Sequence, residues 1–216
     1  MKKQILPLIV MLFLGLVSCE EIGVRGHGDV VSEFRDLNDF TAIKFRIDGD
    51  VYLTQEATQE LRIEAYENII HLIETRVENG ELIIDSDKNI LNGNRLKVFI
   101  SAVDFDKIQL SGSGNIESLS CINVEDLELS ISGSGNIEIC GNAATLNAKV
   151  SGSGNINAYG IEASAVDSRV SGSGNIKVTA NETLEATITG SGNIYYKGSP
   201  QINSHVQGSG RVVNKN

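Results

Sequence analysis

The feature that most constrains this chain is a glycine-rich hexapeptide that occurs six times in its second half. Four copies read SGSGNI, the fifth reads TGSGNI and the last reads QGSGRV. Successive copies begin 21, 19, 20, 18 and 18 residues apart. Self-similarity at a period near twenty residues is typical of a solenoid, in which each repeat contacts only its neighbours. The copies begin at Ser111, Ser132, Ser151, Ser171, Thr189 and Gln207.

Hydrophobic residues alternate with a period of two on both sides of each copy. Leu127, Leu129 and Ile131 precede the second copy, and Ile137 and Ile139 continue the same side after it. Strict alternation indicates a half-buried strand. A coil of about twenty residues cannot bury its apolar side alone, so coils must stack. The sequence therefore predicts an all-β fold, a right-handed parallel β-helix with two strands per coil.

The residues of the repeated corner have expected structural roles. Glycines such as Gly112 and Gly114 are expected to supply the positive φ values of a sharp turn. The asparagines are expected to form a ladder across coils, because an amide both donates and accepts hydrogen bonds. Arg211 replaces the last asparagine and indicates a C-terminal cap, since a charge there discourages further strand addition. A second, looser corner is expected at stretches such as residues 141–144. The ladder comprises Asn115, Asn136, Asn155, Asn175 and Asn193.

Three ligand-binding roles for the corner compete with the purely structural one. A phosphate-binding loop opens a helix, whereas a strand follows each copy here. A calcium-binding β-roll needs Asp in the loop, and the copies contain none. A row of Ser and Asn side chains could hold sugar hydroxyls, so carbohydrate binding stays open beside the structural role. The sequence predicts no metal and no cofactor.

The N-terminus has the pattern of a bacterial lipoprotein signal. Lys2 and Lys3 precede an apolar run over residues 5–17, which is short for a transmembrane helix, and Leu-Val-Ser leads into Cys19. We expect Cys19 to be acylated and to anchor the chain to a membrane without spanning it. An ordinary secretion signal is the alternative. Two glutamates after Cys19 resemble an export tag, which favours the outer membrane, facing the periplasm or the exterior.

These features predict four segments and a limited set of partners. The signal peptide covers residues 1–18, an acylated tether 19–27, an irregular N-terminal part of the β-helix 28–110, and the regular repeats 111–216. The formal net charge of −10 disfavours binding to nucleic acid. The expected partners are a membrane, reached through the lipid, and an extracellular glycan or protein. A homo-oligomer is left open.

The two remaining cysteines hold equivalent places in neighbouring repeats. Cys121 and Cys140 each lie eleven residues before the next copy of the hexapeptide. Stacked strands would place their Cα atoms about 4.8 Å apart, which a disulfide accommodates. The compartment is oxidising. An unbonded stacked pair is the alternative, and no histidine nearby in sequence suggests a zinc site or a thiol catalyst.

An enzymatic site has few candidates in this sequence. Asp48 and Asp50 lie on a degenerate corner, for which a hydrated turn is the favoured interpretation. The histidines share no motif, and the charged residues that follow each Asn-Ile pair are expected to be solvated. The tyrosines are expected not to align in one row. These side chains are His27, His71 and His205; Glu117, Glu138 and Lys177; and Tyr52, Tyr159, Tyr195 and Tyr196.

An ordered set of short motifs runs from about residue 26 to residue 213. The motifs are Val30–Glu33, Phe40–Ile43, Asp48–Leu53, Asn68, Gly80–Leu82 and the GSGNI series. Together they resemble the GIN domain family of adhesin heads. The resemblance implies a β-helical, pectin-lyase-like fold on secreted or lipid-anchored bacterial proteins, a role in adhesion, and no catalytic residues. The alternative is a carbohydrate-active enzyme of the same shape, a polysaccharide lyase or hydrolase, which a cleft with two carboxylates beside Arg or Lys would favour.

Overall fold

The computed structural model describes residues 23–91 and 95–216, and within them the chain is almost entirely β-structure. The predicted signal peptide and Cys19 lie outside the described residues. One 3₁₀ turn occurs among the described residues, at Ile70–Leu72. The strands are β1 (Val24–Arg25), β2 (Val30–Arg35), β3 (Ala42–Phe45), β4 (Asp50–Gln55), β5 (Glu60–Tyr66), β6 (Glu74–Glu78), β7 (Glu81–Asp85), β8 (Ile90–Leu91), β9 (Lys97–Ala102), β10 (Lys107–Leu110), β11 (Asn115–Ser118), β12 (Ile122–Gly133), β13 (Asn136–Gly152), β14 (Asn155–Gly172), β15 (Asn175–Gly190), β16 (Asn193–Lys197), β17 (Gln201–Gly208) and β18 (Arg211–Asn214).

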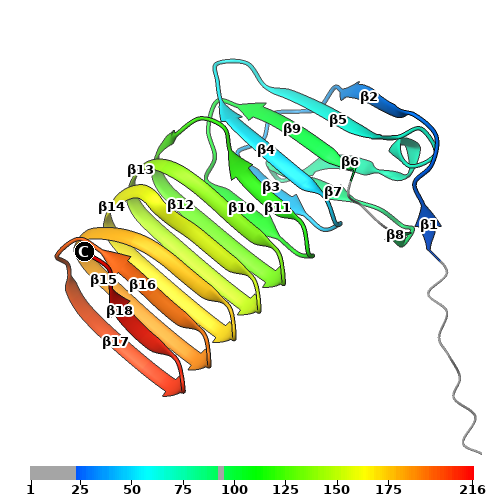
Figure 1. Ribbon diagram of the computed structural model, residues 1–216. Helices are drawn as coiled ribbons and strands as arrows, with labels where there is room; N and C mark the ends of the chain where they lie inside the picture. The colour runs from blue at the N-terminus through cyan, green and yellow to red at the C-terminus, as the bar shows by residue number, and fades with distance from the viewer. Residues whose placement is uncertain (1–22, 92–94) are drawn as a thin grey trace, which may run out of the picture.

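The repeats stack as coils of a parallel β-solenoid, as predicted (Figure 1). Asn136 pairs with Asn155, and Asn155 pairs with Asn175, so identical hexapeptides lie directly over one another. Strands β13 to β15 each run from one GSG corner to the next. The two predicted segments of a coil therefore join through a bend, marked by register shifts such as the one between Glu138 and Cys140.

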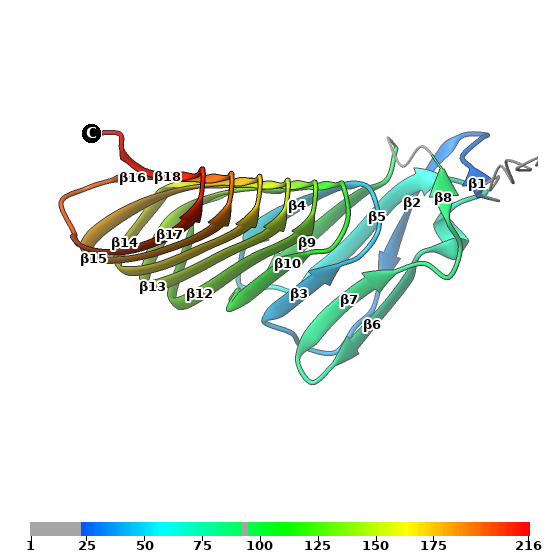
Figure 2. The same cartoon turned by 90° about the horizontal axis from the view of Figure 1, so that it is seen from below.

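Each coil contributes to two faces (Figure 2). The first, which we call the ladder face, is the outer surface of β4, β11, the first parts of β13 to β15, β16 and β18. It continues through β9 and β5 to β2 at the N-terminal end. The second, which we call the opposite face, is the outer surface of β3, β10, β12, the second parts of β13 to β15, and β17.

The glycines of the corner have two different roles. The first glycine of a copy has positive φ at Gly133 and Gly152, and at the equivalent glycines of the later copies. Gly112, however, has no positive φ, and neither do the second glycines such as Gly114 and Gly135, so that part of the prediction is wrong. The second glycine is required by close stacking, because a Cβ at Gly135 would lie 2.3 Å from the carbonyl oxygen of Gly114.

Identical side-chain positions form continuous apolar columns in the interior. Ile116, Ile137, Ile156, Ile176 and Ile194 form one column beneath the ladder face, and each is essentially inaccessible to solvent. Stacking buries every one of these side chains against the coil above and the coil below. Since burying an Ile side chain contributes roughly 1.5–3 kcal/mol, the stacked coils stabilise the solenoid cooperatively.

The N-terminal part covers the start of the solenoid with antiparallel strands. β2 pairs with β5 and β5 pairs with β9, while β6 and β7 form a hairpin. The turn of that hairpin is Asn79-Gly80, where both residues have positive φ, the conformation that an Asn-Gly pair favours in a two-residue hairpin loop. Asp48-Gly49-Asp50 occupies a corner, and Asp50 pairs with Asn115. β1, which lies within the predicted tether, pairs with β8 of the N-terminal part.

The C-terminal coil ends the ladder. The backbone N–H of Arg211 donates to Oδ1 of Asn193 at 3.2 Å, where another asparagine would donate its side-chain amide. Inward-facing Ile202 and Val206 of β17 remain 44% and 41% exposed, although their partners in β15 are buried. Arg211 is thus a chemical end of the ladder, while the apolar end of the coil remains partly accessible.

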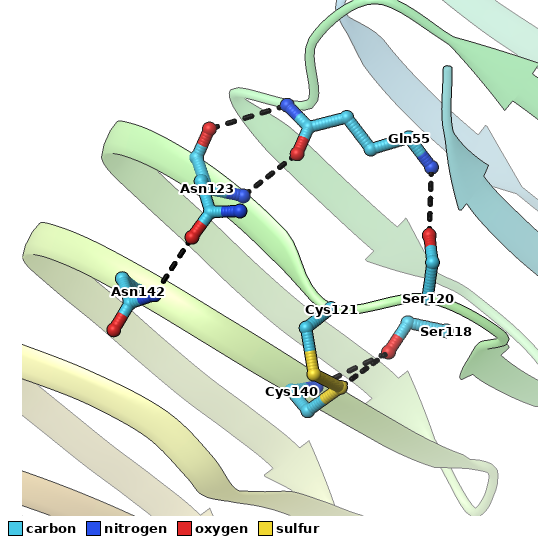
Figure 3. Close-up of a disulfide and its surroundings, with 7 residues drawn as sticks. All are labelled: Gln55, Ser118, Ser120, Cys121, Asn123, Cys140 and Asn142. Atoms are coloured by element: carbon cyan, nitrogen blue, oxygen red, sulfur yellow. Dashed lines mark hydrogen bonds between the residues drawn. A yellow bond between two sulfur atoms is a disulfide. The ribbon is translucent and has the colours of Figure 1, made fainter.

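A disulfide joins the first two coils to each other, and an amide network beside it joins the first of them to the N-terminal part (Figure 3). Cys121 and Cys140 are bonded, with their Cα atoms 4.6 Å apart. Beside them, the side chain of Gln55 pairs with the backbone of Asn123. Its amide nitrogen donates to the Asn123 carbonyl at 3.2 Å, and its oxygen accepts from the Asn123 N–H at 2.7 Å. A side chain from β4 therefore takes the place of a neighbouring strand.

Candidate binding surface

The asparagines of the hexapeptide form a hydrogen-bonded ladder along the edge of the ladder face. Each side-chain nitrogen donates to the oxygen of the preceding asparagine at 2.9–3.1 Å, from Asn136 to Asn193. At the N-terminal end, Asn115 donates to Oδ1 of Asp50 at 2.9 Å. Because each amide uses one side-chain N–H along the ladder, its second N–H remains for other partners. A lone pair of the oxygen also remains, except at Asn175, whose Oδ1 accepts both the backbone N–H and the side-chain N–H of Asn193.

A second row runs parallel to the ladder and two residues further along each strand. Strand register places its members side by side from the N-terminal end of the ladder face to the last complete coil. We call it the face row. It combines aromatic rings, acids, an amide and bases on one accessible surface. Its members in spatial order are Phe34, Arg62, Phe99, Tyr52, Glu117, Glu138, Asn157, Lys177 and Tyr195.

The N-terminal third of the face row is aromatic. The rings of Tyr52 and Phe99 stack with centroids 5.1 Å apart, and the guanidinium of Arg62 lies 3.9 Å from the centroid of Phe99. Phe34 ends the row and is 62% exposed. Burial, together with the negative charges of Asp50 and Glu117, raises the pKa of Tyr52. This end therefore offers flat apolar rings next to a hydrogen-bonding cation.

The middle of the face row is acidic. Glu117 and Glu138 lie in register on adjacent coils and, with Asp50 and Tyr52, line a shallow hollow of about 360 Å³. Asp50 accepts from the ladder, and Oδ1 of Asp48 accepts the backbone N–H of Ser113 at 3.0 Å. Both aspartates therefore have structural bonds at the corner, in agreement with the turn that the sequence favours for them.

The C-terminal third combines tyrosines with lysines around a hollow of about 630 Å³. Lys197 lies 4.7 Å and Lys177 lies 5.9 Å from the ring centroid of Tyr159. Lys215 lies 5.4 Å from the ring centroid of Tyr195. Burial and the neighbouring Tyr195 raise the pKa of Tyr159. We call these five residues the lysine–tyrosine surface.

The structure changes the interpretation of several residues singled out in the sequence. Tyr52 and Tyr195 share the face row, whereas Tyr159 and Tyr196 lie outside it, so the four tyrosines do not form one row. The three histidines are exposed. His27, whose backbone N–H donates to Oδ1 of Asn68, and His71 lie in the N-terminal part, whereas His205 lies on β17. Strand register brings Phe99 and Arg62 into the face row, and Lys197 and Lys215 beside it. Alternation with a period of two does not reveal that register, so the sequence alone could not group these residues.

The opposite face carries the grouping of carboxylates and bases that would favour an enzyme. Glu128, Lys149, Asp167 and Arg169 line a hollow of about 280 Å³. Both oxygens of Asp167 accept hydrogen bonds from Arg169, at 2.7 and 3.1 Å. Glu128 and Asp167 are separated by the intervening coil, which contributes Asn147. The group lies on an open sheet surface, and Asp167 already has a cationic partner.

Two kinds of feature are absent from the part of the chain that the structure describes. No group of three or more His, Cys, Asp or Glu residues in residues 23–91 and 95–216 has the arrangement of a metal site. In the same residues, no helix has the length and apolar character needed to cross a membrane.

Comparison with known proteins identifies the family. Residues 39–200 match the family described as "Putative auto-transporter adhesin, head GIN domain". A putative adhesin from Bacteroides fragilis has a similar structure, with 25% identity and a TM-score of 0.74 over 89% of this chain and all of that one. Two further structures share the fold, and each matches 89% of this chain and 99% of its own. One is a putative lipid binding protein from Parabacteroides distasonis, with 24% identity and a TM-score of 0.59. The other is a putative adhesin from Parabacteroides merdae, with 22% identity and a TM-score of 0.55. No curated protein matches. The chain therefore belongs to the head GIN domain family of adhesin-like proteins.

Proposed function

We propose that this protein is a lipid-anchored adhesin of the bacterial cell envelope that binds an extended glycan along the ladder face without cleaving it. The face row is the observation that carries the proposal. It presents aromatic rings at both ends of one surface, with polar groups between them. Membership of an adhesin-like family supports a role at the cell surface or in the envelope.

The chemistry of the face row suits carbohydrate. The C–H face of a pyranose ring packs against an aromatic face through dispersion and burial of apolar surface. The free N–H groups and lone pairs of the ladder can bind hydroxyls along the chain. Every group projects from a strand held on both sides by neighbouring coils, from Tyr52 in β4 to Tyr195 in β16. Such preorganisation lowers the entropic cost of binding.

A glycan array with the mature chain carrying Cys19→Ala tests this proposal. Retention of a glycan, together with no released product on prolonged incubation, is the expected result. Tyr52→Ala and Tyr195→Ala should each weaken retention, while Thr187→Ala on the opposite face should not. Absence of binding to every glycan would reject the proposal, since a protein ligand would then be the remaining partner. Product release that Glu128→Gln abolishes would favour the carbohydrate-active enzyme instead.

The lipid anchor is tested separately in cells. Cys19→Ala should move the protein from the membrane fraction to the soluble fraction, because acylation of that thiol would supply the membrane affinity. Protease accessibility on intact cells would then show whether the wild-type domain faces the exterior or the periplasm. Retention of the variant in membranes under the same conditions would contradict the anchor.

A further inference from the structure

The lysine–tyrosine surface is a local reversal of charge in an acidic protein. The formal net charge of the chain is −10, yet three lysines gather at this surface. After Glu185 the sequence contains no further Asp or Glu, although Lys197, Arg211 and Lys215 follow. The reversal is therefore concentrated on the last coils, where the sequence supplies basic residues and, after Glu185, no acidic ones.

The three lysines converge from different coils. Lys177 lies on β15 and Lys197 on β16, while Lys215 follows β18, where its N–H donates to the carbonyl of Tyr196 at 2.8 Å. Within the described residues, none of these three lysines forms an ion pair, although surface ion pairs occur elsewhere, such as that between Arg169 and Asp167. Their ammonium groups instead lie over the rings of Tyr159 and Tyr195.

The hollow between these residues also has neutral hydrogen-bonding groups. Asn155 and Asn175 of the ladder line it together with Asn157 of the face row. An occupant of this hollow would meet aromatic rings, amides and uncompensated positive charge within about 630 Å³, the size of a site for one or two sugar rings. A neutral sugar would use the rings and the amides but not the charges.

We infer that the lysine–tyrosine surface binds an acidic sugar unit of a polysaccharide, one that carries a carboxylate or a sulfate. This inference rests on the proposed function and adds the class of ligand. The ring of the sugar packs against Tyr195 or Tyr159, its hydroxyls bind the asparagines, and its anionic group binds the lysines. The acidic middle of the face row then receives neutral or amino sugars of the same chain, since Glu117 and Glu138 repel an anion.

The test is titration calorimetry of the mature Cys19→Ala protein with oligogalacturonate, a sulfated dextran oligomer and neutral dextran of equal length. The triple variant Lys177→Gln, Lys197→Gln, Lys215→Gln removes the charge of the surface. A matched triple variant on the opposite face, Lys44→Gln, Lys107→Gln, Lys149→Gln, removes the same charge elsewhere. Thermal melts establish that both triple variants are folded.

The inference predicts tighter binding of an acidic oligomer than of neutral dextran, and a loss of at least tenfold in affinity for it in the first triple variant alone. The anionic group is a carboxylate if oligogalacturonate binds more tightly, and a sulfate if the sulfated dextran oligomer binds more tightly. Equal losses in both triple variants would indicate general charge attraction and would overturn the inference. The inference would also be overturned if neutral dextran bound as tightly as both acidic oligomers and the first triple variant kept the same affinity for it. That outcome would leave the proposed function intact. No binding in any arm would count against the proposed function as well.

Discussion

At the scale of single residues, stability depends on how each side chain fits between the equivalent side chains of the neighbouring coils. Ser168 is fully buried, and its hydroxyl lacks a hydrogen-bond partner among the described residues. Its neighbours above and below are Ala148 and Ala186, so the column already accommodates a methyl group at that height. A buried hydroxyl without a partner costs about 1–3 kcal/mol. Ser168 is thus a polar residue at a buried position that alanine occupies in both neighbouring coils.

Ser168→Ala is therefore expected to raise the free energy of unfolding by about 1 kcal/mol, because it removes the desolvated hydroxyl without creating a cavity. Equilibrium urea unfolding measures this change. Ser204→Ala, at the exposed end of the same column, should shift the value by less than about 0.5 kcal/mol. A lower stability of Ser168→Ala would show that the hydroxyl has a stabilising partner.

Gly135→Ala tests the close approach of neighbouring corners. The added Cβ would lie 2.3 Å from the oxygen of Gly114 and 2.5 Å from a methyl group of Leu110, and the stacked backbone cannot move away on either side. Overpacking of this kind costs about 1–3 kcal/mol or more, so the melting temperature should fall by several degrees. Ser134→Ala, at an exposed neighbouring position, is the control. An unchanged melting temperature for Gly135→Ala would contradict the stacking distance.

At the scale of elements, each coil depends on its neighbours and the first coils depend on cross-links. β11 is short, and residues 119–121 connect it to β12 outside any strand. The disulfide, Gln55 and the hydrogen bond from the N–H of Cys140 to Oγ of Ser118, at 3.1 Å, stabilise this connection. Later coils pass through the same bend inside a continuous strand.

Removing the disulfide should lower stability without changing the fold. The bond closes a loop with a sequence separation of 19 residues, for which the chain-entropy model gives about 3 kcal/mol. The double variant Cys121→Ser, Cys140→Ser should lose about that amount in urea unfolding and keep the circular dichroism spectrum of the wild type. Reductant should destabilise the wild type alone. Equal stability with and without reductant would contradict a structural bond.

At the scale of the whole molecule, the sequence predicts the architecture better than the site. The period near twenty residues and the alternation around each copy suffice for a parallel solenoid, and the Asn-Gly pair suffices for the β6–β7 hairpin. The face row could not be predicted, because it depends on which residues of distant segments share a register. Phe34, Phe99 and Tyr52 come from separate segments of the sequence. Antiparallel and parallel pairing in one sheet places them in a single row, with Arg62 between Phe34 and Phe99.

The glycines illustrate the same limit at one corner. Gly112 and Gly114 both look like turn residues in the sequence, since glycine is favoured wherever φ is positive. In the structure, positive φ belongs to the first glycine of the later copies, and in those copies the coil beneath leaves no room for a side chain at either glycine. That constraint comes from stacking, so local turn chemistry does not contain it.

The most direct measurement is a crystal structure of the mature Cys19→Ala protein bound to an acidic hexasaccharide. We expect a sugar ring packed against Tyr195 or Tyr159, with its anionic group within hydrogen-bonding distance of at least one of Lys177, Lys197 and Lys215. The remaining units should lie along the face row toward Tyr52. A saccharide bound on the opposite face, beside Glu128 and Asp167, would contradict glycan binding along the ladder face.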